Sequence, residues 1–340
     1  MKRVPFFVSA MAAAVVLSTN ALASDVTVYG KLHVSTDYVT AGSSTDSHAS
    51  MHSNSSRLGF KGKEELDHGL TGIWKFESSI DISDAGNTLK ARNRYVGLSH
   101  SMGQVIFGYH DTPFKIVGGM VETMGDTIGD RRAILGNGAG SNKFNTRAKN
   151  TIMYTSPRMG GLQVKALQSL GENKNPDNTD TQRITSVSAS YARGDLNVAV
   201  AYEDNKLLDA TGVRAAAGYT FGGTTLNALY EKLSSDTAMK YDRPAYGFSV
   251  VQKIKKIKLN AQCFMADDYT DTAKSGASLL ALAASYKLGK KTQVYLAYAT
   301  VNNNDNSTFV VADGGHGSDY STKIAGEDPS AVSFGMIHKF

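Results

Sequence analysis

Hydrophobic and polar residues alternate along most of the chain after Asp25. In the first such segment, Val28 and Val34 stand on one parity, and Lys31 and His33 on the other. Successive side chains of a β-strand point to opposite faces, so this period predicts strands with one apolar and one polar face. Other segments with the same alternation are 57–63, 73–77, 196–203 and 257–265.

The connections between these segments alternate between short and long. The short ones include 66–69, 101–103, 157–161, 193–195, 222–223 and 288–290. The long polar ones include 39–54, 81–90, 111–146, 171–182, 267–276 and 302–328. Counting strands between them predicts sixteen. An even number of antiparallel strands, with tight turns at one rim and long loops at the other, is typical of an all-β transmembrane antiparallel β-barrel.

The first 23 residues have the features of a signal peptide. Lys2 and Arg3 precede an apolar stretch at 6–17, and Ala21 and Ala23 provide a small-x-small cleavage pattern. The apolar stretch is short for a membrane span. We therefore expect residues 1–23 to be removed on export and residues 24–340 to form one domain.

Charge and cysteine content exclude several alternatives. The chain of 340 residues carries a formal net charge of +5, and loss of Lys2 and Arg3 lowers it to +3. No block of five like charges is present, and the basic stretch 253–258 is interrupted by isoleucines, so we expect no nucleic-acid partner. Cys263 is the only cysteine, which excludes an internal disulfide.

Candidate catalytic groups do not form a recognisable motif. The eight histidines are scattered over strands and loops, and no Gly-x-Ser-x-Gly elbow accompanies them. His48 and His52 share one loop, but such a pair is usually only polar. We expect no enzyme activity, no cofactor and no metal site.

Alternation alone does not say which face is outside, so a soluble exported β-sheet binding or adhesive protein stays an alternative. The C-terminus favours the barrel, because its last residues alternate and the final one is aromatic. A strand that reaches the last residue can close a barrel by pairing with the first strand, whereas soluble chains more often end in frayed polar residues. The residues of this terminal strand are Phe334, Met336, His338 and Phe340.

Several segments, in order from the first strand to the last residue, resemble the Gram-negative general porins of the neisserial and beta-proteobacterial trimeric type. The resemblance implies a sixteen-stranded barrel, a homotrimer, and a third long loop, about 111–146, folded into the pore. It also implies an outer-membrane channel for passive diffusion of ions and small hydrophilic solutes. Its partners would be membrane lipid, lipopolysaccharide and the barrel-assembly machinery acting through Phe340. The matching segments are 28–31, 57–62, 69–77, 92–98, 103–109 and 338–340.

The same resemblance implies a basic cluster on the pore wall opposite acids on the third loop. Opposed charges across a narrow aqueous gap create a focused transverse field and bias ion choice. Alternation independently supports an inward direction for three of the basic positions and for Lys75, but not for Arg92, which shares parity with Val96 and Leu98. The implied wall positions are Lys31, Arg57, Arg92 and Arg147.

The acidic side is matched more loosely, because the loop lacks the Pro-Glu-Phe-Gly-Gly motif of enteric porins. Within it we expect Glu122, Asp126 and, less strongly, Asp130 to face the wall. Arg131 and Arg132 in the same loop would pair with these acids and weaken the field. The excess of wall cations predicts a weak anion preference.

A solute-specific outer-membrane channel is the nearest alternative, because specific channels often line the pore with aromatic residues. We favour interfacial girdles for the tyrosines of the predicted strands. Trp74, Phe76 and Tyr95 of the early strands are expected to offer an apolar surface for trimer formation. The tyrosines assigned to girdles are Tyr95, Tyr109, Tyr230 and Tyr295.

Overall fold

The structure, a computed structural model, describes residues 26–40, 42, 47–84, 89–137, 144–171, 183–235, 242–317 and 324–340. The predicted signal peptide therefore lies outside the described residues. All seventeen strand segments belong to one antiparallel sheet. Within the described residues, no helix has the length and apolar character needed to cross a membrane.

Each strand has the length expected for its place between turns and loops. The segments are β1 Thr27–Thr40, β2 His48–Ser53, β3 Arg57–Glu65, β4 Thr71–Ser79, β5 Lys90–His100, β6 Gly103–Asp111, β7 Arg147–Thr155, β8 Leu162–Ser169, β9 Ile184–Arg193, β10 Leu196–Asn205, β11 Ala210–Phe221, β12 Thr224–Ser235, β13 Arg243–Ile254, β14 Ile257–Ala266, β15 Ala277–Lys287, β16 Thr292–Asn303 and β17 Ser330–Lys339. The helical pieces are η1 Asp67–Gly69, α1 Pro113–Gly118 and η2 Arg131–Ala133.

Segments β2 and β3 form one interrupted strand, because both pair with β1 in a continuing antiparallel direction. The barrel therefore has sixteen strands, as predicted. The predicted loop 39–54 is wrong in its extent, since β1 continues to Thr40 and β2 begins at His48. Polar serines and histidines on these residues hid the alternation, and pairing with a neighbouring strand decided their structure.

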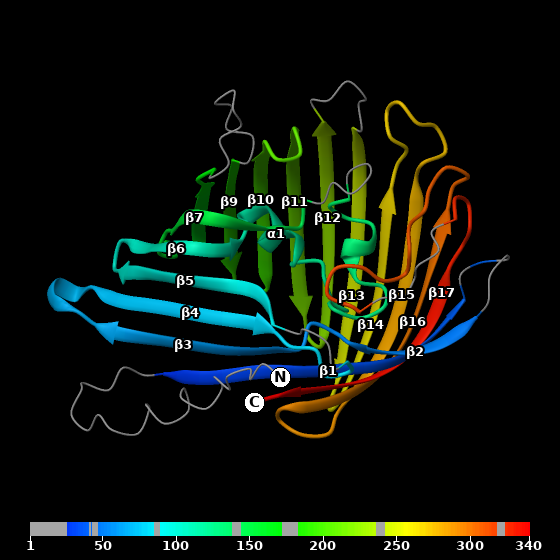
Figure 1. The fold of residues 1–340 in the computed structure, drawn as a ribbon, viewed down its shortest axis with the longest axis horizontal. Coiled ribbons are helices and arrows are strands. Elements are labelled where there is room, and N and C mark those ends of the chain that lie inside the picture. The colour runs from blue at the N-terminus through cyan, green and yellow to red at the C-terminus, as the bar shows by residue number, and fades with distance from the viewer. Residues whose placement is uncertain are drawn as a thin grey trace, which may run out of the picture.

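The sheet closes on itself where the last strand meets the first. In the register of β1 and β17, Lys31 pairs with Lys339 and Thr40 with Ser330. The backbone N–H of Phe340 donates to the Gly30 carbonyl at 3.2 Å. Figure 1 shows the red β17 alongside the blue β1, and neighbours in sequence pair around the rest of the ring. Closure gives the backbone groups of both end strands their partners, as a bilayer requires.

The apolar face of the barrel is its outer surface. On β10, Val200 is 55% exposed, and on β15, Leu282 is 46% exposed while its neighbour Ala281 is fully buried. On β1 the polar His33 and Asp37 are fully buried on the inner face. Large apolar side chains thus point outward, and small or polar ones point inward. This arrangement excludes the soluble β-sheet alternative, whose apolar face would be the core.

Two of the tyrosines assigned to girdles point inward instead. Tyr295 is 4% exposed, and its hydroxyl lies 2.9 Å from His33 Nε2 across the inner face. The Tyr95 ring packs on the His110 ring inside the barrel, with 5.6 Å between centroids. The girdle and trimer-surface interpretations are therefore wrong for Tyr95, and the girdle interpretation is wrong for Tyr295. Tyr95 and Tyr295 directly precede the exposed residues Val96 and Leu296, so alternation along each strand places both rings on the inner face.

The candidate channel constriction

The third long loop follows β6 and packs on the inner wall of the barrel. Its first turn is α1, which begins at Pro113 after Thr112, and the Thr112 hydroxyl accepts from the Lys115 N–H at 3.2 Å. This side chain satisfies one of the free N–H groups at the start of the helix. The ring of Phe114 is fully buried, and α1 contacts β9, β10 and β11. The loop therefore lies inside the barrel instead of over its rim.

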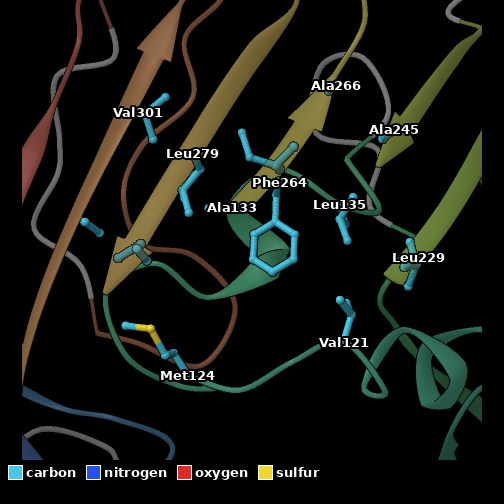
Figure 2. Packing of buried hydrophobic residues seen from close by; sticks show 14 of the residues in the cluster. Val121, Met124, Ala133, Leu135, Leu229, Ala245, Phe264, Ala266, Leu279 and Val301 are labelled. Atoms are coloured by element: carbon cyan, nitrogen blue, oxygen red, sulfur yellow. The ribbon is translucent and has the colours of Figure 1, made fainter. Parts of the chain in front are cut away.

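Apolar side chains hold the rest of this loop against the wall. Figure 2 shows the Phe264 ring of β14 surrounded by loop residues Val121, Ala133 and Leu135, with Leu279 of β15 nearby. Except for Ala133, at 2%, these residues are fully buried and they belong to one cluster. Each fully buried large apolar side chain contributes about 1.5–3 kcal/mol relative to exposure. Their burial accounts for the inward fold of a segment that is long for a connection.

Polar wall residues also bind the backbone of the loop. Gln262 Oε1 accepts from the Thr123 hydroxyl at 2.7 Å, and its Nε2 donates to the Gly129 carbonyl at 2.6 Å. Arg214 Nη1 donates to the Phe114 carbonyl at 2.7 Å. These bonds satisfy buried carbonyl groups and determine the height of the loop in the lumen.

Asp126 at the inner edge of the loop meets three cations. Its carboxylate lies 2.7 Å from Lys31 Nζ, 3.6 Å from an Arg57 Nη and 2.9 Å from an Arg132 Nη. Arg132 also donates from Nε to Asp130 Oδ1 at 2.8 Å. Lys31, Arg57, Arg132, Asp126 and Asp130 form what we name the Asp126 cluster. As expected, Arg132 pairs with the acids of its own loop.

The surroundings of the loop carboxylates shift the pKa values of Asp126 and Glu122 in opposite directions. Burial opposes ionisation of Asp126, but Lys31 and Arg132 hold the pKa of its carboxyl well below the usual range. Burial and the neighbouring Asp130 carboxylate instead raise the pKa of Glu122 to about 7. The Glu122 carboxylate accepts from the backbone N–H groups of Met124 and Arg131, each at 2.9 Å. Glu122 and Asp130 thus bond mainly within their own loop, apart from a 3.5 Å contact between Gln262 Nε2 and Glu122, whereas Asp126 faces the wall.

A second group of charges lies on the wall around Glu77 of β4. Its carboxylate is 2.6 Å from Arg92 Nε and 3.3 Å from Lys75 Nζ, and it accepts from the Tyr29 hydroxyl at 2.8 Å. We name Lys75, Arg92 and Glu77 the Glu77 cluster.

A β-bulge explains why alternation did not direct Arg92 inward. Phe76 pairs with Arg94, but Ser78 pairs with Ala91, so Arg92 and Asn93 share the place opposite Glu77. The extra residue reverses the parity of the strand beyond it. Arg94 stays on the outer face, over the Phe76 ring at 4.2 Å, while Arg92 reaches Glu77.

The third group joins the start of the loop to the wall. Asp111 at the end of β6 lies 2.7 Å from Lys115 Nζ and 3.1 Å from Arg147 Nε. We name Asp111, Lys115 and Arg147 the Asp111 cluster. Arg147 faces inward as predicted, but parity does not explain it, because the register shifts between Gly108 and His110 and separates Arg147 from Ile152 and Tyr154. The ion pair nevertheless brings Arg147 to the same side as Arg57, within electrostatic range.

The predicted wall cations therefore lie within electrostatic range of one another, and three partners were missed. Glu77 carried a usable signal, because it shares parity with Lys75 and opposes exposed Phe76. Asp111 and Lys115 carried none, since their pairing depends on where the loop turns inward. Of the terminal residues, Phe334 and Met336 lie on the outer face, while His338 and Phe340 complete the strand that pairs with β1.

Comparison with known proteins agrees with this architecture. The family described as Gram-negative porin matches residues 9–306, and the chain belongs to that family. It is an outer-membrane channel protein and not an enzyme, as the sequence predicted.

Among individual relatives, outer membrane porin protein 32 of Delftia acidovorans is 27% identical, over 93% of this chain and 94% of the relative. An outer membrane porin protein of Bordetella pertussis is 28% identical, over 44% of this chain and 42% of its own length. The anion-selective porin from Comamonas acidovorans superposes with a TM-score of 0.80 at 24% identity, covering 94% of this chain and all of that one. A trimer form of OmpT from Vibrio cholerae superposes with a TM-score of 0.69 at 17% identity, covering 94% and 100%.

Proposed function

We propose that the loop 112–137 and the facing wall form the constriction of a water-filled channel for ions and small hydrophilic solutes, with a weak preference for anions. The proposal rests on the charge balance of the three clusters. The Asp126, Glu77 and Asp111 clusters each contain one cation more than they contain carboxylates. Paired charges largely cancel at a distance, so the excess in each cluster determines the sign of the field that a passing ion meets.

The geometry also supports a transverse field. Lys31, Arg57 and Arg92 come from the wall strands β1, β3 and β5, while Asp126 comes from the loop that folds against this wall and lies 2.7 Å from Lys31 Nζ. Low-dielectric protein on both sides focuses such a field through the remaining water. The field orders the water in the channel and orients dipolar solutes, which disfavours the passage of apolar solutes. The relative named as an anion-selective porin shares this fold and lends the sign further support.

The test is the reversal potential of the purified protein in planar bilayers under a KCl gradient. Wild type is expected to favour chloride. In the double variant Arg57→Ala, Arg147→Ala, two of the wall cations are lost, so selectivity shifts towards cations and single-channel conductance rises. Lys274→Ala is a matched control, because Lys274 is an exposed loop cation paired with Asp305 at 2.7 Å. An unchanged reversal potential in the double variant would count against the proposal.

We further propose that the protein assembles as a homotrimer through the outer face of its early strands. Phe76 and Val96 are exposed there on β4 and β5, and Trp74 lies half-buried beside them. A self-associating surface of this kind suits closed cyclic symmetry. Cross-linking in detergent should give a species of three chains, and Phe76→Asp should reduce it to one. A wild-type protein that stays monomeric would contradict the proposal.

Export and insertion complete the proposed function. Removal of residues 1–23 is expected to leave Ser24 or Asp25 as the first residue, which N-terminal sequencing of the purified protein would read directly. Phe340 is 41% exposed at the end of the closing strand, where the barrel-assembly machinery can bind it. Deletion of Phe340 is expected to lower the amount inserted among lipid and lipopolysaccharide without changing the channel of the protein that does insert.

A further inference from the structure

The chain after β16 enters the barrel before it reaches β17. Residues 307–317 form this segment, which we name the inner strap (Figure 1, orange). Its direction is set at Asn303, whose Nδ2 donates to the Phe309 carbonyl at 2.9 Å and whose Oδ1 accepts from the Phe309 N–H at 2.9 Å. Val311 and Ala312 are 0% and 1% exposed and belong to the same buried cluster as the constriction loop. The sequence had predicted only a long polar loop at 302–328.

The inner strap contacts the constriction loop along its backbone. The Gly129 N–H donates to the Val311 carbonyl at 2.6 Å. The guanidinium of Arg243 lies 4.9 Å from the Phe309 ring and donates to the Asn137 carbonyl at 2.6 Å. One wall arginine therefore joins the strap and the constriction loop.

Gly314 and Gly315 of the inner strap pack on the charged side chains of the Asp126 cluster. A Cβ atom at Gly314, whose φ is +77°, would overlap the Arg132 guanidinium, and one at Gly315 would overlap the Asp126 carboxylate. Only glycine allows the backbone to approach this closely. The strap thus limits the positions that Arg132 and Asp126 can take.

The far end of the strap is attached to the wall at β1 and β2. His316 Nε2 lies 2.9 Å from Asp37 Oδ2 of β1, and both side chains are fully buried. The Gly317 N–H donates to Asn54 Oδ1 at 3.2 Å, and the His316 ring stacks at a tilt against His52 of β2, 5.1 Å between centroids. The strap thus leaves the wall at β16 and is attached again at β1, which is separated from β16 only by β17.

We propose that the inner strap positions the ion pairs of the constriction, and that the His316–Asp37 contact is the latch that keeps it in the lumen. The latch residues are positioning residues, since they act through Arg132 and Asp126. Loss of the latch is expected to release Gly314 and Gly315 from the Asp126 cluster. Conductance then rises because a chain segment leaves the lumen, and Arg132 spreads away from the acids. The inference rests on the proposed constriction function.

The experiment measures strap position and channel behaviour separately. The full-length protein carries Cys263→Ser and Ala312→Cys, and a charged methanethiosulfonate reagent labels the buried thiol. With the latch intact, labelling is slow. His316→Ala is expected to raise the labelling rate about tenfold or more, since exposure follows the open population. In bilayers the same variant is expected to show higher conductance and an anion-to-cation permeability ratio that differs from that of the wild type by about twofold.

Three further variants sharpen the test. Asp37→Asn and the double variant with His316→Ala should behave as His316→Ala does, because the two side chains make one contact. His316→Gln keeps a donor for Asp37 and should restore slow labelling. Asp305→Asn, an exposed acid at the base of the same loop, should change neither readout.

Either of two results would overturn the inference: labelling that stays slow in His316→Ala, or fast labelling with unaltered conductance and selectivity. Failure of the proposed function is distinguishable from both. It would show as absence of anion preference in the wild type, while the labelling rates would still report on the strap.

Discussion

Neutralising Asp126 is the most direct way to alter the field of the channel. Asp126→Asn removes the carboxylate charge that Lys31, Arg57 and Arg132 share at 2.7, 3.6 and 2.9 Å. The residue has φ +62°, a conformation that asparagine tolerates well, so the backbone of the loop has no reason to move. The substitution therefore changes charge with little change of shape.

The size of the effect follows from Coulomb's law. An anion about 6 Å from the carboxylate is repelled by about 0.7 kcal/mol even at the dielectric constant of water, ~80. Loss of that repulsion favours anions by about threefold and disfavours cations by about the same factor, so the permeability ratio changes by up to about tenfold before screening. Because the Debye length is about 10 Å at 0.1 M salt and about 3 Å at 1 M, the change should shrink at high salt.

Reversal potentials in KCl gradients at low and high mean concentration measure this ratio. We expect Asp126→Asn to raise the preference for chloride at least about threefold at low salt and less at high salt. Asp305→Asn removes an equal charge from an exposed loop position and should leave the ratio unchanged. A shift towards cations, or an equal shift at both concentrations, would refute the reasoning.

Two further predictions concern pH and lipid contact. Because the pKa of Glu122 is raised to about 7, its neutral form favours the folded loop; that stability is complete below the unfolded pKa of about 4.5 and is lost as pH rises through 7. Protonation of Glu122 also removes a negative charge from the loop, so anion preference should increase as the pH falls from 8 to 6. Glu122→Gln should abolish this pH dependence of the reversal potential, and a variant that keeps it would contradict the assignment. Leu282→Arg places a charge on the outer face of β15 and should cost about 2–4 kcal/mol in urea unfolding from vesicles. Leu288→Arg, at a turn, should cost about 0–1 kcal/mol, and equal costs would mean that Leu282 does not face lipid.

Local alternation was sufficient where a strand is regular. Lys31, Arg57 and Lys75 were directed inward by the apolar residues that flank them, and the structure places them so. Alternation gives no valid direction wherever an extra residue interrupts the count, even where the predicted direction is right, as for Arg147. Arg92 lies beyond the bulge of β5, and Arg147 lies beyond the register shift of β7, where Asn150 has φ +52°. A bulge is set by pairing with the neighbouring strand, which no single segment of sequence records.

The loops were even less accessible from sequence. Apolar residues such as Phe114, Val121 and Leu135 do not reveal by themselves which surface will bury them. The resemblance to porins placed that loop in the pore, but nothing placed the strap residues Val311 and His316 beside it. Their destination depends on Asp37, Gly129 and other partners that are far away in the chain.

The sequence by itself determined the class of architecture: strands of period two, their number, and the set of charges available to the inner face. These are properties of short segments, because side-chain direction in a strand depends only on parity. The tertiary structure alone decided which face meets lipid, where parity reverses, and which loop charges meet which wall charges. Those outcomes depend on closure of the sheet and on contacts between distant residues, whose free energy exists only once the barrel has formed.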